Sequence, residues 1–303
     1  MATNAASFVD PLAQLFAHSL RSPILRRPDE EGLDFEEVWF PSLDGVVLEG
    51  WFIPAKGSNK LIIANHPMPC NRYGYPGHLP GFQQFGGFEC NFIKDYKVLH
   101  DAGYNVICYD LRNHGRSSTG SGGICGIGQL ECRDVVGSIL YARSRADTAN
   151  MEIGLLSRCL GANSTIIAAS RFPEHFADIK AIIALQPVSA RAFIETGAKA
   201  AGVDPQEAAQ EFDVNIHNRT GFHIDELSPI PYSKDVKTPT LVVQVRKDVM
   251  TYPGDVQAVY DNLGSQQKEL FWIEGTTRRF DGYNYFGTRP EKMLSWYGKH
   301  MTT

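Results

Sequence analysis

The sequence predicts an α/β fold, with a doubly wound, mostly parallel sheet and helices on both of its faces. Two observations support this. Short and nearly continuous apolar runs alternate with helical stretches from residue 60 onward, as is typical of parallel strands buried on both faces. Before them, two alternating segments flank Asp44-Gly45, a strong hairpin turn signal. Ligands are expected at the carboxyl ends of the strands of such a sheet.

Each element has a local signal. The antiparallel pair is expected over 35–42 and 46–54. The parallel strands are expected over 61–65, 105–109, 153–156, 179–185, 240–245 and 269–273. The helices are expected over 91–102, 127–145, 162–171, 255–263 and 290–300.

The pattern predicts one core with additions. Residues 33–188 and 238–303 form the core, and residues 1–32 form an N-terminal arm with one short amphipathic helix over 8–20 and no sign of chemistry. Residues 189–237 are expected as a small helical lid, with a helix opened by the capping sequence Asp204-Pro205-Gln206-Glu207. Residues 66–87 form a long loop rich in Gly, Pro and aromatic residues, including Tyr73; long loops are usually functional.

Composition excludes several classes of partner. The net charge is −5 and no run of Lys and Arg could neutralise phosphates, so we expect no nucleic acid. No apolar run reaches the length of a membrane span, and no secretory signal opens the chain, so we expect a cytoplasmic protein without a membrane partner. The aromatic loop and the lid suggest a pocket for a small-molecule substrate that is partly aromatic or apolar. A homo-oligomer is compatible with the sequence. Six scattered cysteines without a C-x-x-C pair predict no disulfide scaffold, and we expect no metal or cofactor.

The segment Ser157-Arg158-Cys159-Leu160-Gly161 is the most informative in the chain. It follows an apolar strand, precedes a helix, and has the small-x-nucleophile-x-small form of a nucleophile elbow. Small residues at both ends allow a sharp turn, which presents the central side chain above a helix N-terminus. The sequence therefore predicts Cys159 as a nucleophile.

With these elements in place, the chain resembles the α/β-hydrolase superfamily from about residue 35 onward. The resemblance rests on the elbow and on three further segments: 65–68 (Asn-His-Pro-Met), 109–117 (Tyr-Asp-Leu-Arg-Asn-His-Gly-Arg-Ser) and 242–248 (Val-Val-Gln-Val-Arg-Lys-Asp). A cysteine nucleophile makes the chain similar to the dienelactone hydrolase branch, which is normally smaller and lacks a lid.

The resemblance implies roles for particular residues. The oxyanion hole would use the N–H of Leu160 and, because Pro67 has no N–H, that of Met68. Asp248 would be the acid of a catalytic triad. His114 matches a histidine that usually fixes the turn after the fourth strand of the family.

The histidine that the resemblance requires is absent. It should follow the last strand in a Gly-x-x-His pattern, but the sequence places Arg278 there. Arginine stays protonated and cannot act as a general base, although it can pair with Asp248 and hold positive charge near the thiol. A helix N-terminus and the adjacent Arg158 are surroundings that favour a thiolate, so attack would need no base.

Three outcomes stay open for the second half of the reaction, because an attacking water still has to lose a proton. Another base could substitute, from His66 or from the lid residues His217 and His223. A non-water acceptor could take the acyl group, or the reaction could be a cyclisation or a C–C bond step. A separate interpretation is that the protein is an inactive member of the fold, which binds a ligand or a partner.

Overall fold

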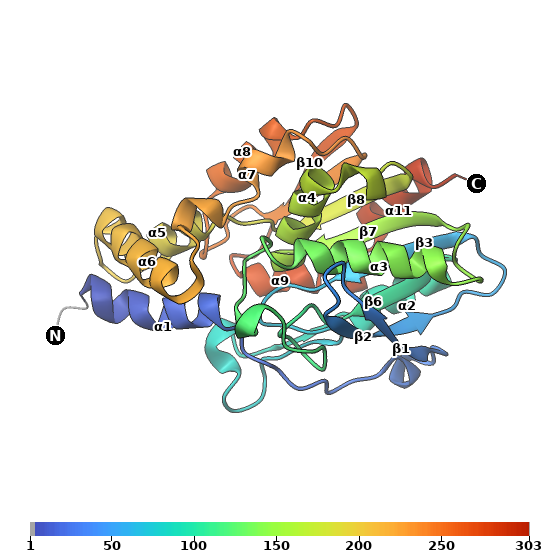
Figure 1. Cartoon of the computed structure of the whole chain (residues 1–303), viewed down its shortest axis with the longest axis horizontal. Coiled ribbons are helices and arrows are strands. Elements are labelled where there is room, and N and C mark those ends of the chain that lie inside the picture. Colours follow the sequence, from blue (N-terminus) through green and yellow to red (C-terminus); the bar gives the residue numbers. More distant parts are fainter. Residues whose placement is uncertain (1–3, 303) are drawn as a thin grey trace.

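The computed structural model describes residues 4–302 and is built on one eight-stranded sheet (Figure 1). The strands follow the order β1-β2-β6-β3-β7-β8-β9-β10 across the sheet. Their bounds are β1 Glu36–Pro41, β2 Val47–Ile53, β3 Lys60–Asn65, β6 Asn105–Tyr109, β7 Glu152–Arg158, β8 Ile179–Leu185, β9 Thr240–Val245 and β10 Lys268–Ile273.

The direction of pairing is as the sequence predicts. β1 and β2 form an antiparallel hairpin, β2 also pairs antiparallel with β6, and every later neighbour is parallel. The register aligns the carboxyl ends of the central strands, since Asn65 of β3 lies opposite both Tyr109 and Ser157. The loops that follow β3, β6 and β7 therefore meet at one edge of the sheet.

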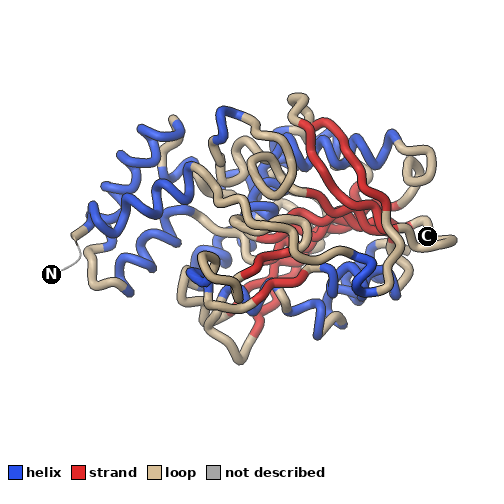
Figure 2. The backbone as a smooth tube through the Cα atoms, turned by 90° about the horizontal axis from the view of Figure 1, so that it is seen from below, coloured by secondary structure: helices blue, strands red, loops and turns tan. Residues whose placement is uncertain are grey.

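Helices cover both faces of the sheet, as Figure 2 shows with the strands in red and the helices in blue. Buried residues of α3 and α4 join one apolar core and those of α2 and α11 join the other. The two cores stabilise the sheet from both sides, which confirms the doubly wound arrangement. The helices of this part span α2 Ile93–Asp101, α3 Cys132–Ser144, α4 Leu160–Arg171, α7 Ile230–Ser233, α8 Pro253–Asn262, α9 Arg279–Tyr283, α10 Tyr285–Thr288 and α11 Glu291–His300.

The insertion between β8 and β9 carries helices α5 Ala190–Ala200 and α6 Pro205–Thr220. The Asp204 carboxylate accepts bonds from the N–H groups of Gln206 and Glu207, both at 2.9 Å, as the capping sequence predicts. The helix ends at Thr220 and is followed by Gly221, whose φ of 80° suits glycine.

The N-terminal helix α1, Ala5–Ala17, packs against α6 and α5 and forms with them a three-helix group beside the sheet edge (Figure 1). Phe16 contacts the rings of Phe193 in α5 and Phe212 in α6, with centroids 5.3 and 5.5 Å apart. The helix is therefore part of a core and not only a surface arm. Residues 1–3 of the expected arm lie outside the described residues.

The loop after β3 contains structure that its composition does not reveal. It forms a small antiparallel pair, β4 Gly74–Pro76 with β5 Glu89–Asn91, and the short 3-10 turn Gln83–Phe85 between them. Gly74 has a φ of 130°, and a Cβ there would meet the Cys90 carbonyl oxygen at 2.0 Å. The two short strands of the loop are thus held close together.

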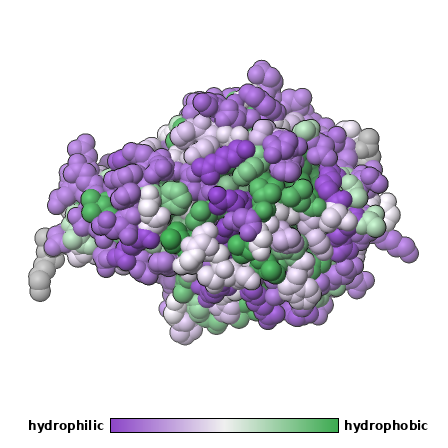
Figure 3. Space-filling view, viewed as in Figure 1, coloured by the Kyte–Doolittle hydropathy of each residue, from purple (hydrophilic) through white to green (hydrophobic). Residues whose placement is uncertain are grey.

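Within residues 4–302, no helix is long and apolar enough to span a membrane. Figure 3 shows mostly hydrophilic residues over the outer surface of the three-helix group. The apolar residues Val9, Phe16, Phe212 and Ile216 of these helices are buried between them.

Candidate active site

Cys159 lies at a sharp turn between β7 and α4. Its φ of 47° and ψ of −109° are rare for a residue with a side chain, and helix α4 begins at the next residue. A Cβ at Gly161 would meet the Asn65 carbonyl oxygen at 2.6 Å, so only glycine allows α4 to approach β3 this closely. Below the turn, the Ser157 hydroxyl bonds to Thr165 at 2.7 Å. The local geometry is that of a nucleophile elbow.

Two backbone N–H groups flank this turn. No acceptor among residues 4–302 bonds the N–H of Leu160 or of Met68, and both residues line the same pocket as Cys159. The loop that carries Met68 is tied to the elbow, because the Gly161 N–H donates to the His66 carbonyl at 3.2 Å. Two free donors beside a nucleophile suit an oxyanion hole. The assignment of this role to the N–H groups of Leu160 and Met68 stays a prediction.

Asp248 follows β9 and is almost fully buried, with 7% of its surface exposed. One carboxylate oxygen accepts from Arg279 Nη1 at 2.7 Å and from the Thr251 hydroxyl at 2.8 Å. The other accepts from the Met250 N–H at 2.9 Å. These contacts fix the carboxylate, and its partner is an arginine.

The arginine that meets Asp248 is Arg279, so the expectation for Arg278 is wrong by one residue. Arg278 precedes the first turn of α9, is more than half exposed, and pairs with Asp281 at 2.9 Å. Arg279 is 3% exposed. Within the short helix α9, residues 279 and 283 are four apart and share a face. That spacing, Arg279 with Tyr283, was the signal in the sequence that could have identified both.

Arg279 connects three groups. Besides Asp248, it donates from Nε to the Tyr283 hydroxyl at 2.9 Å and from Nη2 to the carbonyl of Gln186, a buried residue with a φ of 53°. Burial by itself would lower the pKa of Arg279, but Tyr283, Cys159 and Asp248 hold it well above its usual value. A permanently charged guanidinium therefore lies beside the thiol.

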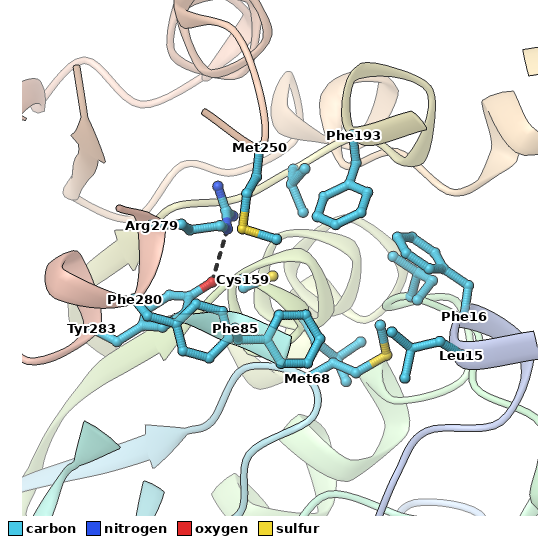
Figure 4. Close-up of a pocket in the computed structure, with 13 residues that line it drawn as sticks. Leu15, Phe16, Met68, Phe85, Cys159, Phe193, Met250, Arg279, Phe280 and Tyr283 are labelled. Carbon is cyan, nitrogen blue, oxygen red and sulfur yellow. Dashed lines mark hydrogen bonds between the residues drawn. The ribbon is translucent and has the colours of Figure 1, made fainter. Parts of the chain in front are cut away.

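The Tyr283 hydroxyl completes the arrangement. It accepts from Arg279 Nε, as the dashed line in Figure 4 shows, and the residue lines the same pocket as Cys159. Burial raises the pKa of Tyr283 well above its ordinary range, against the opposing effect of Arg279, so the hydroxyl stays protonated at neutral pH. Two hydrogen bonds thus connect Asp248, Arg279 and Tyr283, and Tyr283 shares the pocket with Cys159.

The pocket above Cys159 is lined mostly by apolar side chains, and its empty volume of about 480 Å³ includes space that is open to solvent. Its lining comes from distant segments that converge in Figure 4, including Leu15 and Phe16 of α1, in which the sequence suggested no chemistry. The polar side chains that line it are those of Cys159, Arg279 and Tyr283. The apolar lining is formed by Leu15, Phe16, Met68, Phe85, Ile127, Leu160, Val188, Phe193, Met250 and Phe280.

No histidine of the described chain lines this pocket. His66 is buried, its Nε2 accepts from the Leu111 N–H at 2.9 Å, and its Nδ1 lies 2.9 Å from the Pro67 carbonyl. Both ring nitrogens are engaged, and burial lowers the pKa of His66 well below 6.5. His66 is thus a neutral structural residue, which excludes it as the substitute base in this conformation.

The other candidate residues also lie away from the sulfur. His114 is buried with its Nδ1 2.8 Å from the Arg112 carbonyl, in the turn after β6. His217 and His223 stack on each other with ring centroids 4.1 Å apart, on the outer side of the insertion. The Tyr73 hydroxyl donates to Glu89 at 3.0 Å.

Arg158 does not face the pocket either. It is fully buried on the opposite side of the strand, where it lies over the Phe92 ring and pairs with Asp95 at 3.4 Å. Alternation along β7 explains this, because neighbouring residues of a strand point to opposite faces. The expectation that Arg158 holds charge beside the thiol is therefore wrong, and Arg279 is the cation that lies there.

Comparison with known proteins gives structural but no sequence matches. No protein-family model matches the chain, and no curated protein matches it either. Among solved structures, an esterase of Pyrococcus furiosus, PF2001, is similar with a TM-score of 0.69 and 19% identity, covering 94% of this chain and 98% of that one.

Two further structures align over most of their length. The α/β hydrolase GrgF from Penicillium has a TM-score of 0.61 and 16% identity, covering 89% of this chain and 100% of its own. The dienelactone hydrolase of Anabaena variabilis has a TM-score of 0.55 and 16% identity, covering 88% and 99%. The strand order, the elbow and these likenesses together show that the chain has the α/β-hydrolase fold.

Proposed function

We propose that the protein is an enzyme that uses Cys159 as a nucleophile on the ester, lactone or thioester of a small, largely apolar molecule. One observation carries the proposal: the thiol is held at the apex of an elbow, in an apolar pocket and at the N-terminus of α4. The N-terminus of α4 begins beside this thiol and the Arg279 guanidinium lines the same pocket, and surroundings of this kind favour a nucleophilic sulfur.

The first chemical step forms an acyl-enzyme. The Cys159 sulfur attacks the carbonyl carbon, the carbonyl oxygen gains negative charge between the N–H groups of Leu160 and Met68, and the leaving group departs. The apolar pocket binds the acyl chain, and the helices α1 and α5 that supply Leu15, Phe16 and Phe193 act as its cover. Asp248 holds Arg279 in place.

A second candidate keeps the acyl-enzyme but replaces water with another acceptor, by acyl transfer, cyclisation or C–C bond formation. The observation that favours it is the absence of any imidazole among the residues that line the pocket in the described chain. A reaction in ¹⁸O-labelled water separates the two, because hydrolysis places label in the released acid and transfer to another acceptor does not.

The test of the nucleophile uses p-nitrophenyl butyrate as the probe. The wild-type chain should release nitrophenolate and gain one butyryl group in intact-mass analysis, whereas Cys159→Ala should do neither. Cys132→Ala is the matched control, since Cys132 is a buried cysteine of α3 whose sulfur contacts the Gln129 carbonyl, away from the pocket. If Cys159→Ala retains turnover and acylation, the proposal is wrong. Binding of the ester by wild type without acylation would instead identify an inactive binding member of the fold.

A further inference from the structure

We propose that the Tyr283 hydroxyl is a further catalytic group, which transfers the proton that a histidine transfers in a triad. This inference rests on the proposed function of Cys159. It begins from the position of Tyr283, which lines the same pocket as Cys159 and whose hydroxyl accepts the Arg279 Nε–H at 2.9 Å. Arg279 in turn is bound to Asp248.

The chemistry needs a group that can both give and receive a proton beside the sulfur. Among the side chains that line the pocket, Arg279 cannot, because a guanidinium stays protonated. Leu15, Met68, Phe85 and the other lining residues are apolar. The Tyr283 phenol is the remaining polar group, and it is a donor in its neutral form and a base once it has lost its proton.

The proton transfers balance over the two half-reactions. In the first, the Cys159 thiolate forms the S–C bond while the C–O bond of the ester breaks, and Tyr283 gives its proton to the departing alkoxide. The phenolate that remains is stabilised by the adjacent Arg279 cation. In the second, the incoming water or alcohol gives its proton to the phenolate, its oxygen forms the new C–O bond, and the S–C bond breaks to restore the thiolate.

Geometry explains how the phenolate is stabilised in a buried place. Arg279 carries one positive charge and Asp248 one negative charge, and both side chains are about 2% exposed. Arg279 reaches Asp248 with Nη1 and Tyr283 with Nε, so the guanidinium links the carboxylate to the phenol. Asp248 orients the guanidinium of Arg279. The guanidinium orients the Tyr283 hydroxyl and stabilises the negative charge that forms on it. Asp248 and Arg279 are therefore positioning residues in this scheme.

The test compares two butyrate esters with different leaving groups. Nitrophenolate leaves without a proton, whereas the ethoxide of ethyl butyrate needs one. We expect Tyr283→Phe to lower kcat/KM by about 100-fold or more on ethyl butyrate, the range of general acid catalysis, and by less than about 10-fold on p-nitrophenyl butyrate. Tyr297→Phe is the matched control, because Tyr297 is equally buried and donates to the Leu155 carbonyl at 2.8 Å.

Equal losses on both esters, or no loss on ethyl butyrate, would overturn the role of Tyr283 while leaving that of Cys159 intact. Turnover by Cys159→Ala would instead overturn the nucleophile, so the two failures are distinguishable. If Tyr283→Phe does not fold, 3,5-difluorotyrosine at position 283 keeps the shape and makes the phenol more acidic. The alkaline limb of the pH profile of kcat/KM on ethyl butyrate should then move to lower pH, and an unchanged limb would contradict the proposal.

Discussion

Arg279 and Asp248 form a buried ion pair, with Nη1 and Oδ2 2.7 Å apart, behind the proposed nucleophile. In the family that the sequence resembles, a histidine would occupy the place between acid and nucleophile. Here an arginine and a tyrosine on one turn of α9 share that place, and the pair keeps the carboxylate neutralised.

Arg279→Gln should destabilise the protein strongly. It leaves the Asp248 carboxylate buried without its cation, and breaking a buried ion pair costs about 3–5 kcal/mol. Urea unfolding measures the loss. Arg278→Gln is the adjacent control, and because its ion pair with Asp281 is exposed it should cost at most about 1 kcal/mol. Similar losses for both variants would contradict the assignment of Arg279 to the buried pair.

Replacing Cys159 with glycine should give a more stable protein than replacing it with alanine. The φ of 47° at this position is strained for any residue with a Cβ. Such strain costs on the order of 1–3 kcal/mol, so we expect Cys159→Gly to exceed Cys159→Ala by about 1 kcal/mol in free energy of unfolding. Equal free energies of unfolding for the two variants would mean that the backbone at position 159 is not strained.

Gly161→Ala should damage the elbow. The new methyl group would meet the Asn65 carbonyl carbon and oxygen at 2.7 and 2.6 Å, and these are backbone atoms that cannot turn aside. We expect a loss of about 1–3 kcal/mol from overpacking, together with at least about 10-fold lower esterase activity because the Leu160 N–H shifts. Gly298→Ala, in helix α11 with open space around its Cα, should be neutral or slightly stabilising.

His66 should make the protein less stable as the pH falls. Burial holds its folded pKa well below 6.5, so the unfolded chain takes up the proton first. The stabilisation is therefore complete above pH 6.5 and declines below it, by up to about 1.4 kcal/mol per pH unit. Urea unfolding of wild type and His66→Gln between pH 5 and 8 should give curves that converge at low pH. Parallel curves would show that His66 is not held neutral.

Phe193→Ala should change the preference among acyl chains. Phe193 lines the pocket from α5 and packs on Phe16 of α1. Its removal enlarges the apolar space, so kcat/KM on p-nitrophenyl octanoate relative to the butyrate should rise by about 10-fold or more, because even one methylene in an apolar pocket contributes about 1–3 kcal/mol. Phe222→Ala, which lies outside the pocket lining, is the control. An unchanged ratio would place the acyl chain elsewhere.

The sequence by itself determined the fold class and the elbow. Each parallel strand is a short apolar run, because a strand buried on both faces needs apolar residues at successive positions. The elbow depends on small residues at fixed spacing around Cys159, and Asp248 follows its strand directly. These requirements are local, so each can be recognised within a single segment of the sequence.

Tertiary structure decided which residues surround Cys159 in the pocket. Arg278 and Arg279 are neighbours in sequence, and only the start of α9 points one toward Asp248 and the other to solvent. Leu15 and Phe16 reach the pocket because α1 packs on helices some 200 residues later in the chain. Such contacts depend on how apolar faces pack together, which the pattern of one segment does not specify.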